Sequence, residues 1–325
     1  MSNITLNLYS LLGALLLSTW LPPAIAQPYP SKSIRIIVPF PAGGIADVYA
    51  RLIGNRVTEA WGQPVVVENR TGAGGNIGAD AVAKSAPDGY TLAMGSLGTH
   101  AVNVSLFAKM PYDPVRDFAP IALVLEAEGL LVVHPSVPAQ NVPELINHLR
   151  SKPGALAYAS AGMGTASHLA GELFKTMAKV DMVHVPYKGN VPAITDLLAG
   201  QTSLLFATMP TVLPHAKAGK LRALATIGTA RSAAAPDIPT IAEVLPGFEV
   251  NNWIGLFAPA DTPSEIVQRW NTEVVRFMQS PEIQARLRNE GARFVPTAPH
   301  QFAAFVKAEI AKWAPVVRAS GARIE

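Results

Sequence analysis

The chain has 325 residues, with 26 Lys and Arg, 23 Asp and Glu, a formal net charge of +3 and no cysteine. Its basic residues are scattered, so the charge indicates neither a nucleic-acid-binding protein nor one that binds an anionic membrane surface. The lack of cysteine excludes disulfides, iron–sulfur clusters, thiolate metal sites and cysteine nucleophiles.

The N-terminus has the pattern of a secretion signal, although no Lys or Arg precedes its apolar run. Residues 11–17 form that run, Pro22 and Pro23 end it, and residues 24–26 (Ala-Ile-Ala) have the small-x-small form of a signal-peptidase site. The alternative is a membrane anchor, but the run is shorter than the roughly 20 residues of a spanning helix. We predict that residues 1–26 are a cleaved signal peptide and that the mature protein is periplasmic.

The first part of the mature chain alternates between strand-like and helix-like segments. Short β-branched runs are expected as strands at 34–38, 65–68 and 91–94, and helices are expected at 45–61 and 76–85, before a loop. This alternation predicts an α/β architecture with a mainly parallel sheet.

A second series with the same alternation follows. Its expected strands are 129–134, 155–160, 181–185, 203–207 and 222–227, and its expected helices are 142–151, 167–179, 191–199 and 213–219. A further strand at 252–257 and helices at 263–279, 281–290 and 299–320 come last. The length of the mature chain suits about two domains, and we expect the C-terminal helices to pack back on the first.

Two glycine-bearing turns stand out because each follows a strand-like run and opens onto a helix. They are residues 39–44, followed by Asp47, and residues 160–165, followed by His168. Helix N-termini present unpaired N–H groups and the positive end of the helix dipole, so two such turns predict a clamp for a small anion. The structural alternative is a pair of ordinary strand-to-helix turns, with Asp47 as a first-turn acid and His168 exposed.

Enzyme signatures are mostly missing. The glycine-rich segment 70–78 has the spacing G-x-G-x-x-x-G rather than that of a dinucleotide-binding turn, and we interpret it as shaping the mouth of a cleft. Ser96 is no nucleophile elbow because Met94 stands where glycine is required. The seven histidines show no metal-ligand spacing. We expect no metal and no cofactor, although a catalytic triad assembled only in space stays open.

The motifs taken together resemble the substrate-binding proteins of tripartite tricarboxylate transporters, the Bug or TctC family. The resemblance covers the whole mature chain in order. It is carried by residues 39–51, 66–78, 87–92, 164–172, 184–189 and 216–225.

The resemblance implies a non-enzymatic, two-domain periplasmic binding protein, a type II-like clamshell in which each domain is a mixed, mainly parallel sheet flanked by helices. Domain 1 would comprise residues 27–126 and 229–325, and domain 2 residues 127–228, with the ligand cleft between them. Matching of motifs implies that the ligand contacts are Phe40, Ala42, Gly43, Gly44, Asp47, Ser96, Thr99, Ala161, Gly162, Gly164, Thr165, His168 and Tyr187, with Lys188 as a further wall.

One segment departs from the family pattern. Where many relatives read roughly GQVDLMFD, residues 200–207 of this chain have no acidic residue, and Ala207 stands at the last position. A buried ligand ammonium group needs a counter-charge. If Ala207 faces the cleft, we therefore expect the ligand to be a plain, di- or aromatic carboxylate rather than an amino acid.

The expected function is capture of a small organic carboxylate for a transporter. The family implies integral membrane transporter subunits as partners, and we expect a monomer that binds no nucleic acid. Two alternatives remain open from the sequence: a ligand sensor for a membrane receptor, and a secreted hydrolase or isomerase on a similar scaffold.

Overall fold

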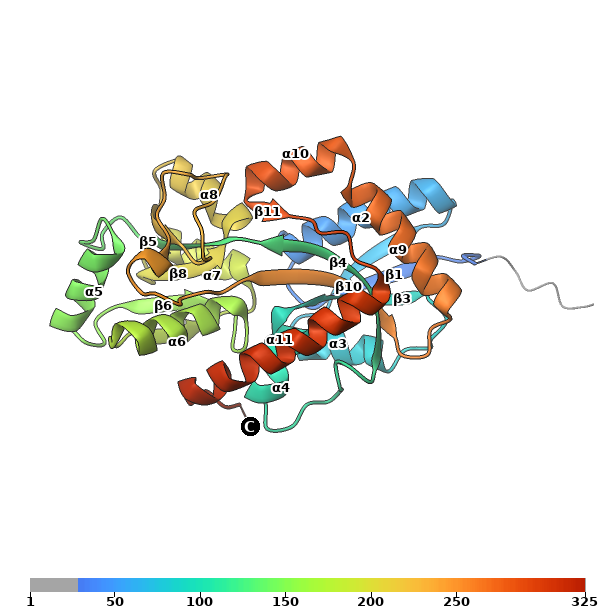
Figure 1. Cartoon of the computed structure of the whole chain (residues 1–325), viewed down its shortest axis with the longest axis horizontal. Coiled ribbons are helices and arrows are strands. Elements are labelled where there is room, and N and C mark those ends of the chain that lie inside the picture. The colour runs from blue at the N-terminus through green and yellow to red at the C-terminus, as the bar shows by residue number, and fades with distance from the viewer. Residues whose placement is uncertain (1–28, 325) are drawn as a thin grey trace, which may run out of the picture. The chain divides into compact units, whose positions relative to one another are not determined.

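The computed structural model describes residues 29–324, and the described residues from Lys32 onward form one compact unit. This unit contains two β-sheets flanked by helices (Figure 1). The predicted signal peptide, residues 1–26, lies outside the described residues. Within the described range, no helix combines the length and the apolarity needed to cross a membrane.

The first sheet has six strands and is built from both ends of the unit. In spatial order its strands are β11 (Ala292–Arg293), β4 (Phe118–Ala127), β10 (Asn252–Pro259), β3 (Thr91–Ser96), β1 (Ile34–Val38) and β2 (Val65–Asn69). The second sheet has five strands from the middle of the chain. Its order is β7 (Val183–Pro186), β6 (Ala157–Ser160), β8 (Leu204–Thr208), β5 (Gly129–Val133) and β9 (Arg222–Thr226).

Both sheets are mixed, as predicted, but parallel pairing is not the main kind. β1 is parallel to β2 and β3, and β6 is parallel to β7 and β8. By contrast, β10 is antiparallel to β3 and β4, β11 is antiparallel to β4, and β5 is antiparallel to β8 and β9. The reason is that β5 and β10 each enter their sheet from the other sheet, without the crossover helix that a parallel pair requires.

The sequence interpretation missed β4 entirely. Pro120 lacks a backbone N–H and lies next to a register shift in the pairing of β4 with β10. Proline in a strand argues against a central strand unless a bulge accommodates it. Here the register shift accommodates Pro120, and the local sequence does not reveal that shift.

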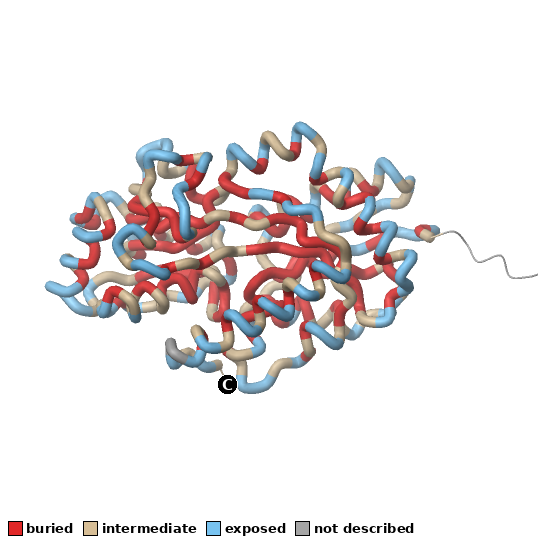
Figure 2. Tube along the Cα trace, viewed as in Figure 1, coloured by how far each residue is buried: buried red, intermediate tan, exposed pale blue. Residues whose placement is uncertain are grey.

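Helices cover both faces of each sheet, and Figure 2 shows the buried strands between their more exposed outer surfaces. The first sheet has α2 (Ile45–Trp61) and α9 (Ser264–Met278) on one face, and α3 (Asn76–Ala83), α4 (Asn103–Leu106) and α11 (Pro299–Ser320) on the other. The second sheet has α5 (Val142–Ser151) and α6 (Ala166–Ala178) on one face, and α7 (Asn190–Leu198) and α8 (Met209–Lys217) on the other. α10 (Pro281–Glu290) precedes β11 and contacts α8. Short helical turns complete the fold at η1 (Ala73–Gly75), η2 (Gly98–Val102) and η3 (Ile241–Glu243).

Local sequence explains where most helices begin and end. α2 ends at Gly62, which has the left-handed φ of 72° that glycine tolerates best at a helix C-terminus. α9 places Val267, Trp270, Val274 and Met278 on one buried face at spacings of three and four. α8 begins at Met209, four residues before its expected start, because Pro210 fits the first turn of a helix.

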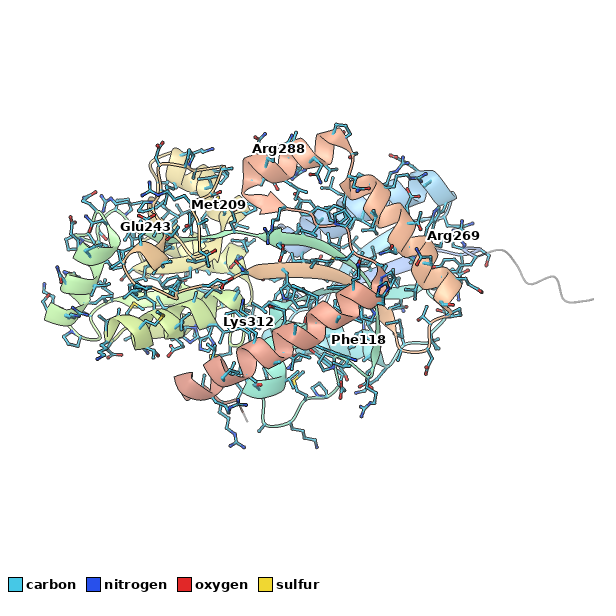
Figure 3. The ribbon with its side chains drawn as sticks, in the orientation of Figure 1. Phe118, Met209, Glu243, Arg269, Arg288 and Lys312 are labelled. Carbon is cyan, nitrogen blue, oxygen red and sulfur yellow. The ribbon has the colours of Figure 1, made fainter. Side chains whose placement is uncertain are left out.

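The chain passes between the sheets at two places that lie side by side. Glu128 joins β4 directly to β5, and residues 227–251 join β9 to β10. The Glu128 N–H donates to Gly291 O (2.9 Å), and the N–H of Met209, labelled in Figure 3, donates to Glu128 O (2.7 Å). Ile227 N–H donates to Gly129 O (3.0 Å). The two connections are therefore tied into one region.

A buried carboxylate fastens α11 to the central strand of the first sheet. Glu309, 8% exposed, accepts hydrogen bonds from the indole N–H of Trp253 (3.1 Å) and that of Trp313 (3.2 Å). Both tryptophans are 1% exposed. Because buried indole N–H groups need acceptors, one carboxylate satisfies two otherwise unpaired donors.

We expect Glu309→Leu to lower the free energy of unfolding by about 2–4 kcal/mol, since it leaves two buried donors without a partner. Glu309→Gln keeps a carbonyl acceptor at the same place, so its loss should be smaller, below about 1.5 kcal/mol. Urea denaturation of the two variants beside the parent protein measures this. Equal losses for Leu and Gln would contradict the role given to the acceptor.

Candidate functional site

A cavity lies between the first and the second sheet. Its volume is ≈ 80 Å³, counted as the space open to the centre of a water-sized sphere, which is room for several waters or a small organic molecule. From the first-sheet side it is lined by Phe40, Pro41, Gly44, Ile45, Ala46, Ser96, Gly98, Asn252 and Ile254. From the second-sheet side and its connection it is lined by Gly129, Ala161, Thr165, Ala166, Ser167, Asn190, Val191, Phe206, Ala207, Thr208 and Ile227.

Three helix N-termini meet at this cavity. α2, α6 and α7 begin at its wall, and they are 17, 13 and 9 residues long. Their N-cap residues, Gly44, Thr165 and Gly189, make no side-chain capping hydrogen bond, which is also true of α3, α9 and α10, so their position at the cavity sets them apart. The first N–H groups of the three helices are therefore left for a ligand, and the helix dipoles favour an anion.

Among the described residues, the cavity wall is mostly apolar, with a few polar side chains and no charged one. No lining residue that the structure describes is a Lys, Arg, His, Asp or Glu. The Oδ1 atom of Asn190 is buried at this wall and has no hydrogen-bond partner among the described residues. Anion binding here would depend on backbone dipoles, hydroxyls and amides rather than on an ion pair.

Asp47 holds the first turn and does not line the cavity. It is 3% exposed, accepts from Gly43 N–H (2.9 Å) and pairs with Arg51 (2.8 Å). The amide of Asn69 donates both to Asp47 (3.0 Å) and to Phe40 O (2.9 Å). Burial acts to raise the pKa of Asp47, but the hydrogen bonds from Arg51, Gly43 and Asn69 outweigh burial and keep that pKa low. The carboxylate thus stays ionised and fixes the turn that carries Gly44.

Thr99 holds the backbone at Ser96 in the way that Asp47 holds the first turn. The Ser96 N–H donates to Thr99 Oγ1 (3.0 Å), and Thr99 itself is fully buried. Tyr112 OH donates to Thr99 O (2.8 Å). Thr99 Oγ1 also lies 2.9 Å from His100 Nδ1, and complete burial lowers the pKa of His100 to about 3. Ser96 alone of this group reaches the cavity.

The second turn is held by its own hydroxyls. Ala161 N–H donates to Ser167 Oγ (2.8 Å), and Thr165 Oγ1 donates to Gly162 O (2.7 Å). Gly162 and Gly164 have φ values of +126° and +80°, a region that glycine favours. Tyr187 OH donates to Asp196 (2.7 Å) and does not line the cavity.

The structure brings some of the predicted contacts to the cavity and leaves others outside it. Six line it: Phe40, Gly44, Ser96, Ala161, Thr165 and Ala207. Eight do not: Ala42, Gly43, Asp47, Thr99, Gly162, Gly164, His168 and Tyr187. Among these eight, Asp47 and Thr99 hold the backbone of their turns by hydrogen bonds to Gly43 and Ser96.

Sequence reasoning expected a helix at 191–199 but did not assign its start, with Asn190 and Val191, to the site, nor the polar residues Ser167, Thr208 and Asn252. Gly189, with φ +128°, was the available signal, because it follows a strand and precedes a helix like the two turns that were identified. Asn252 follows an irregular segment, so no local pattern pointed to it.

Comparison with known proteins gives one consistent family. A family model described as "Tripartite tricarboxylate transporter family receptor" (TctC) matches residues 49–322. Protein BugT of Bordetella pertussis is 39% identical over 305 residues, covering 93% of this chain and 94% of BugT.

Solved structures agree with that match. One described as "R. palustris Rpa4515 with adipate" has a TM-score of 0.88 and 39% identity, covering 91% of this chain and 100% of the other. MatC (Rpa3494) from Rhodopseudomonas palustris, described with bound malate, has a TM-score of 0.85 and 38% identity, covering 89% and 100%.

The buried histidines predict a pH dependence of stability. Burial holds the pKa of His100 in the folded state below its ordinary value near 6.5, so the unfolded state binds more protons below that pH. The free energy of unfolding should therefore fall as pH drops from about 6.5 toward 4, by up to ~1.4 kcal/mol per pH unit for such a histidine. Urea unfolding at pH 7, 6, 5 and 4.5 measures this slope. His100→Phe should reduce the slope, and an unchanged slope would contradict the assignment.

Proposed function

Since this chain belongs to the TctC family of tripartite tricarboxylate transporter receptors, we propose that it is exported to the periplasm and captures a small organic carboxylate there. The family consists of transport receptors rather than enzymes, which argues against the hydrolase or isomerase alternative. The observation that carries the proposal is the meeting of three uncapped helix N-termini at one uncharged cavity.

A dicarboxylate of short chain length is the ligand class we favour. Near the connection between the sheets, the residues that line the cavity include Thr208 and Asn252. Apolar side chains such as Ile45, Phe206 and Ile254 line the space as well. One carboxylate would occupy the helix starts, the chain would contact the apolar walls, and a second polar group would reach Thr208 and Asn252. The relatives described with adipate and with malate have ligands of this class.

We propose that the two sheets belong to two domains, residues 27–126 with 229–325 and residues 127–228, that close on the ligand. Glu128 and residues 227–251 would form the hinge. Glycines lie where the two sides approach each other: a Cβ added to Gly74 would lie 2.7 Å from Met163 O, and one added to Gly189 would lie 2.5 Å from Pro41 Cδ. Such close approach suits a closed state in which both sides contact the anion.

The remaining parts of the proposal concern location and partners. A signal peptide at residues 1–26 would direct export, and integral membrane subunits of the transporter would receive the ligand. The receptor would act as a monomer, because one chain supplies both sides of the cavity.

The wild-type protein should bind adipate or malate in preference to aspartate or glutamate. Ala207, 3% exposed, lines the cavity, so Ala207→Asp would set a carboxylate within about 5 Å of the ligand and repel it by about 3 kcal/mol, or on the order of 100-fold in affinity. Isothermal titration calorimetry with the four acids measures this, and exposed Ala233→Asp is the matched control. Micromolar binding of the amino acids by the wild-type protein would contradict the proposed selectivity.

The proposed closure of the two domains on the ligand leads to a second prediction. Gly189→Ala would press its methyl group against Pro41 across the gap between the sheets, so dicarboxylate affinity should fall about tenfold or more. Gly219→Ala is the control for adding a methyl group at a glycine of positive φ, because Gly219 has φ +71° and no atom within 4 Å of an added Cβ. Small-angle X-ray scattering with and without adipate should show less ligand-induced compaction for Gly189→Ala. Equal affinities for the two variants would argue against closure at this contact.

A further inference from the structure

Two stacked imidazoles lie behind the second ligand turn. The rings of His168 and His184 have centroids 4.5 Å apart, and the His184 ring stacks on Tyr158 with centroids 4.7 Å apart. His168 is 2% exposed. Neither histidine lines the cavity, although both lie next to the turn that does.

Each ring is linked to a backbone N–H of the turn 161–165, His168 directly and His184 through Ser160. The N–H of Gly164 donates directly to His168 Nδ1 (3.3 Å). The N–H of Gly162 donates to Ser160 Oγ (3.1 Å), and Ser160 Oγ lies 2.7 Å from His184 Nε2. The two glycines that shape the turn are thus each connected to one imidazole.

These contacts fix the protonation state of both rings. His168 Nδ1 faces an N–H donor, so it must carry a lone pair. Ser160 is fully buried. Among the described residues, His184 Nε2 is the acceptor that lies within reach of the Ser160 hydroxyl proton. A proton on His168 Nδ1 would set donor against donor and break the bond to Gly164 N–H, and a proton on His184 Nε2 would turn the Ser160 hydroxyl proton away from its acceptor.

The surroundings favour neutral rings. The charged neighbours are Glu172 and Lys175 on α6, and Tyr158 OH donates to Glu172 (2.6 Å). Burial lowers the pKa of His168, with Glu172 acting against this effect and Lys175 acting with it. Burial also lowers the pKa of His184 to about 3, and His168 and Lys175 add to the effect.

We propose that His168 and His184 are positioning residues that hold the turn 161–165 from behind as neutral acceptors, so that carboxylate binding uses no histidine cation. The proposal rests on the proposed function for its ligand. It replaces the expectation that His168 contacts the anion. Binding should therefore not strengthen as pH falls through 6.5, whereas a histidine cation at an anion site would strengthen it.

The protonation state can be tested without any ligand. Long-range ¹H–¹⁵N correlation spectra of the ligand-free protein, recorded from pH 8 to pH 5, report the tautomer of each imidazole. We expect the Nε2–H tautomer for His168 and the Nδ1–H tautomer for His184 throughout. A cationic ring, or the opposite tautomer, at either position at pH 6 would overturn the proposal.

The positioning role is tested with two variants at each histidine: one removes the acceptor nitrogen, and the other replaces it with an amide oxygen. His184→Phe keeps the stacked ring but removes the acceptor, and His184→Gln restores an acceptor near the Nε2 position. His168→Leu and His168→Asn form the corresponding pair for Nδ1. Calorimetry with adipate and malate should show about a tenfold loss for Phe and Leu, equivalent to one hydrogen bond, and affinities within about threefold of wild type for Gln and Asn.

The exposed His300→Asn variant is the control for losing a histidine. Glutamine and asparagine variants as weak as their apolar partners, or wild-type affinity that rises between pH 8 and pH 6, would overturn the proposal. If the wild-type protein binds neither acid, the proposed ligand class fails. The ligand-free spectra still decide the protonation of the two rings in that case.

Discussion

Unpaired backbone N–H groups at three helix starts are the constraint on which the rest of the site depends. Their N-cap residues make no side-chain capping hydrogen bond, and a cavity shared by two sheets surrounds them. Leaving such donors without a partner is unfavourable, so an anion that accepts from both sides stabilises their approach. In the function proposed above, an uncharged wall recognises a charged ligand through these backbone donors, and side chains such as those of Thr208 and Asn252 distinguish one acid from another. Neutral histidines behind the turn fit the same scheme, because the attraction comes from the backbone.

Much of the fold could be predicted from local sequence, because its strands and helices follow simple rules. The run of β-branched residues in β1 and the apolar face of α9 each identify their element without help from the tertiary structure. The failures concern elements whose identity depends on distant partners. β4 contains Pro120 and is stabilised as a strand by pairing with β10. The antiparallel pairing of β5 and β10 follows from the path of the chain between sheets, which periodicity does not encode.

The candidate site shows the same division. Motifs located two of the three helix starts, and Ala207 was singled out because it differs from the family pattern and does line the cavity. Asp47 and Thr99 were expected from the motifs to contact the ligand, but in the structure they hold the turns through bonds to Gly43 and Ser96 respectively. A sequence motif does not distinguish a residue that touches a ligand from one that fixes the backbone touching it. Only the direction of the side chain separates the two roles.

The position of β10 in the first sheet also constrains the order in which the protein can fold. β10 lies between β3 and β4, yet nearly half of the chain separates it from β3 in sequence. During synthesis, the N-terminal strands can pair with one another, but the sheet cannot reach its final strand order until residues 252–259 have left the ribosome. Contacts so distant in sequence form slowly. A nascent chain that completes its first sheet last would remain unfolded for longer, which would suit the export proposed above.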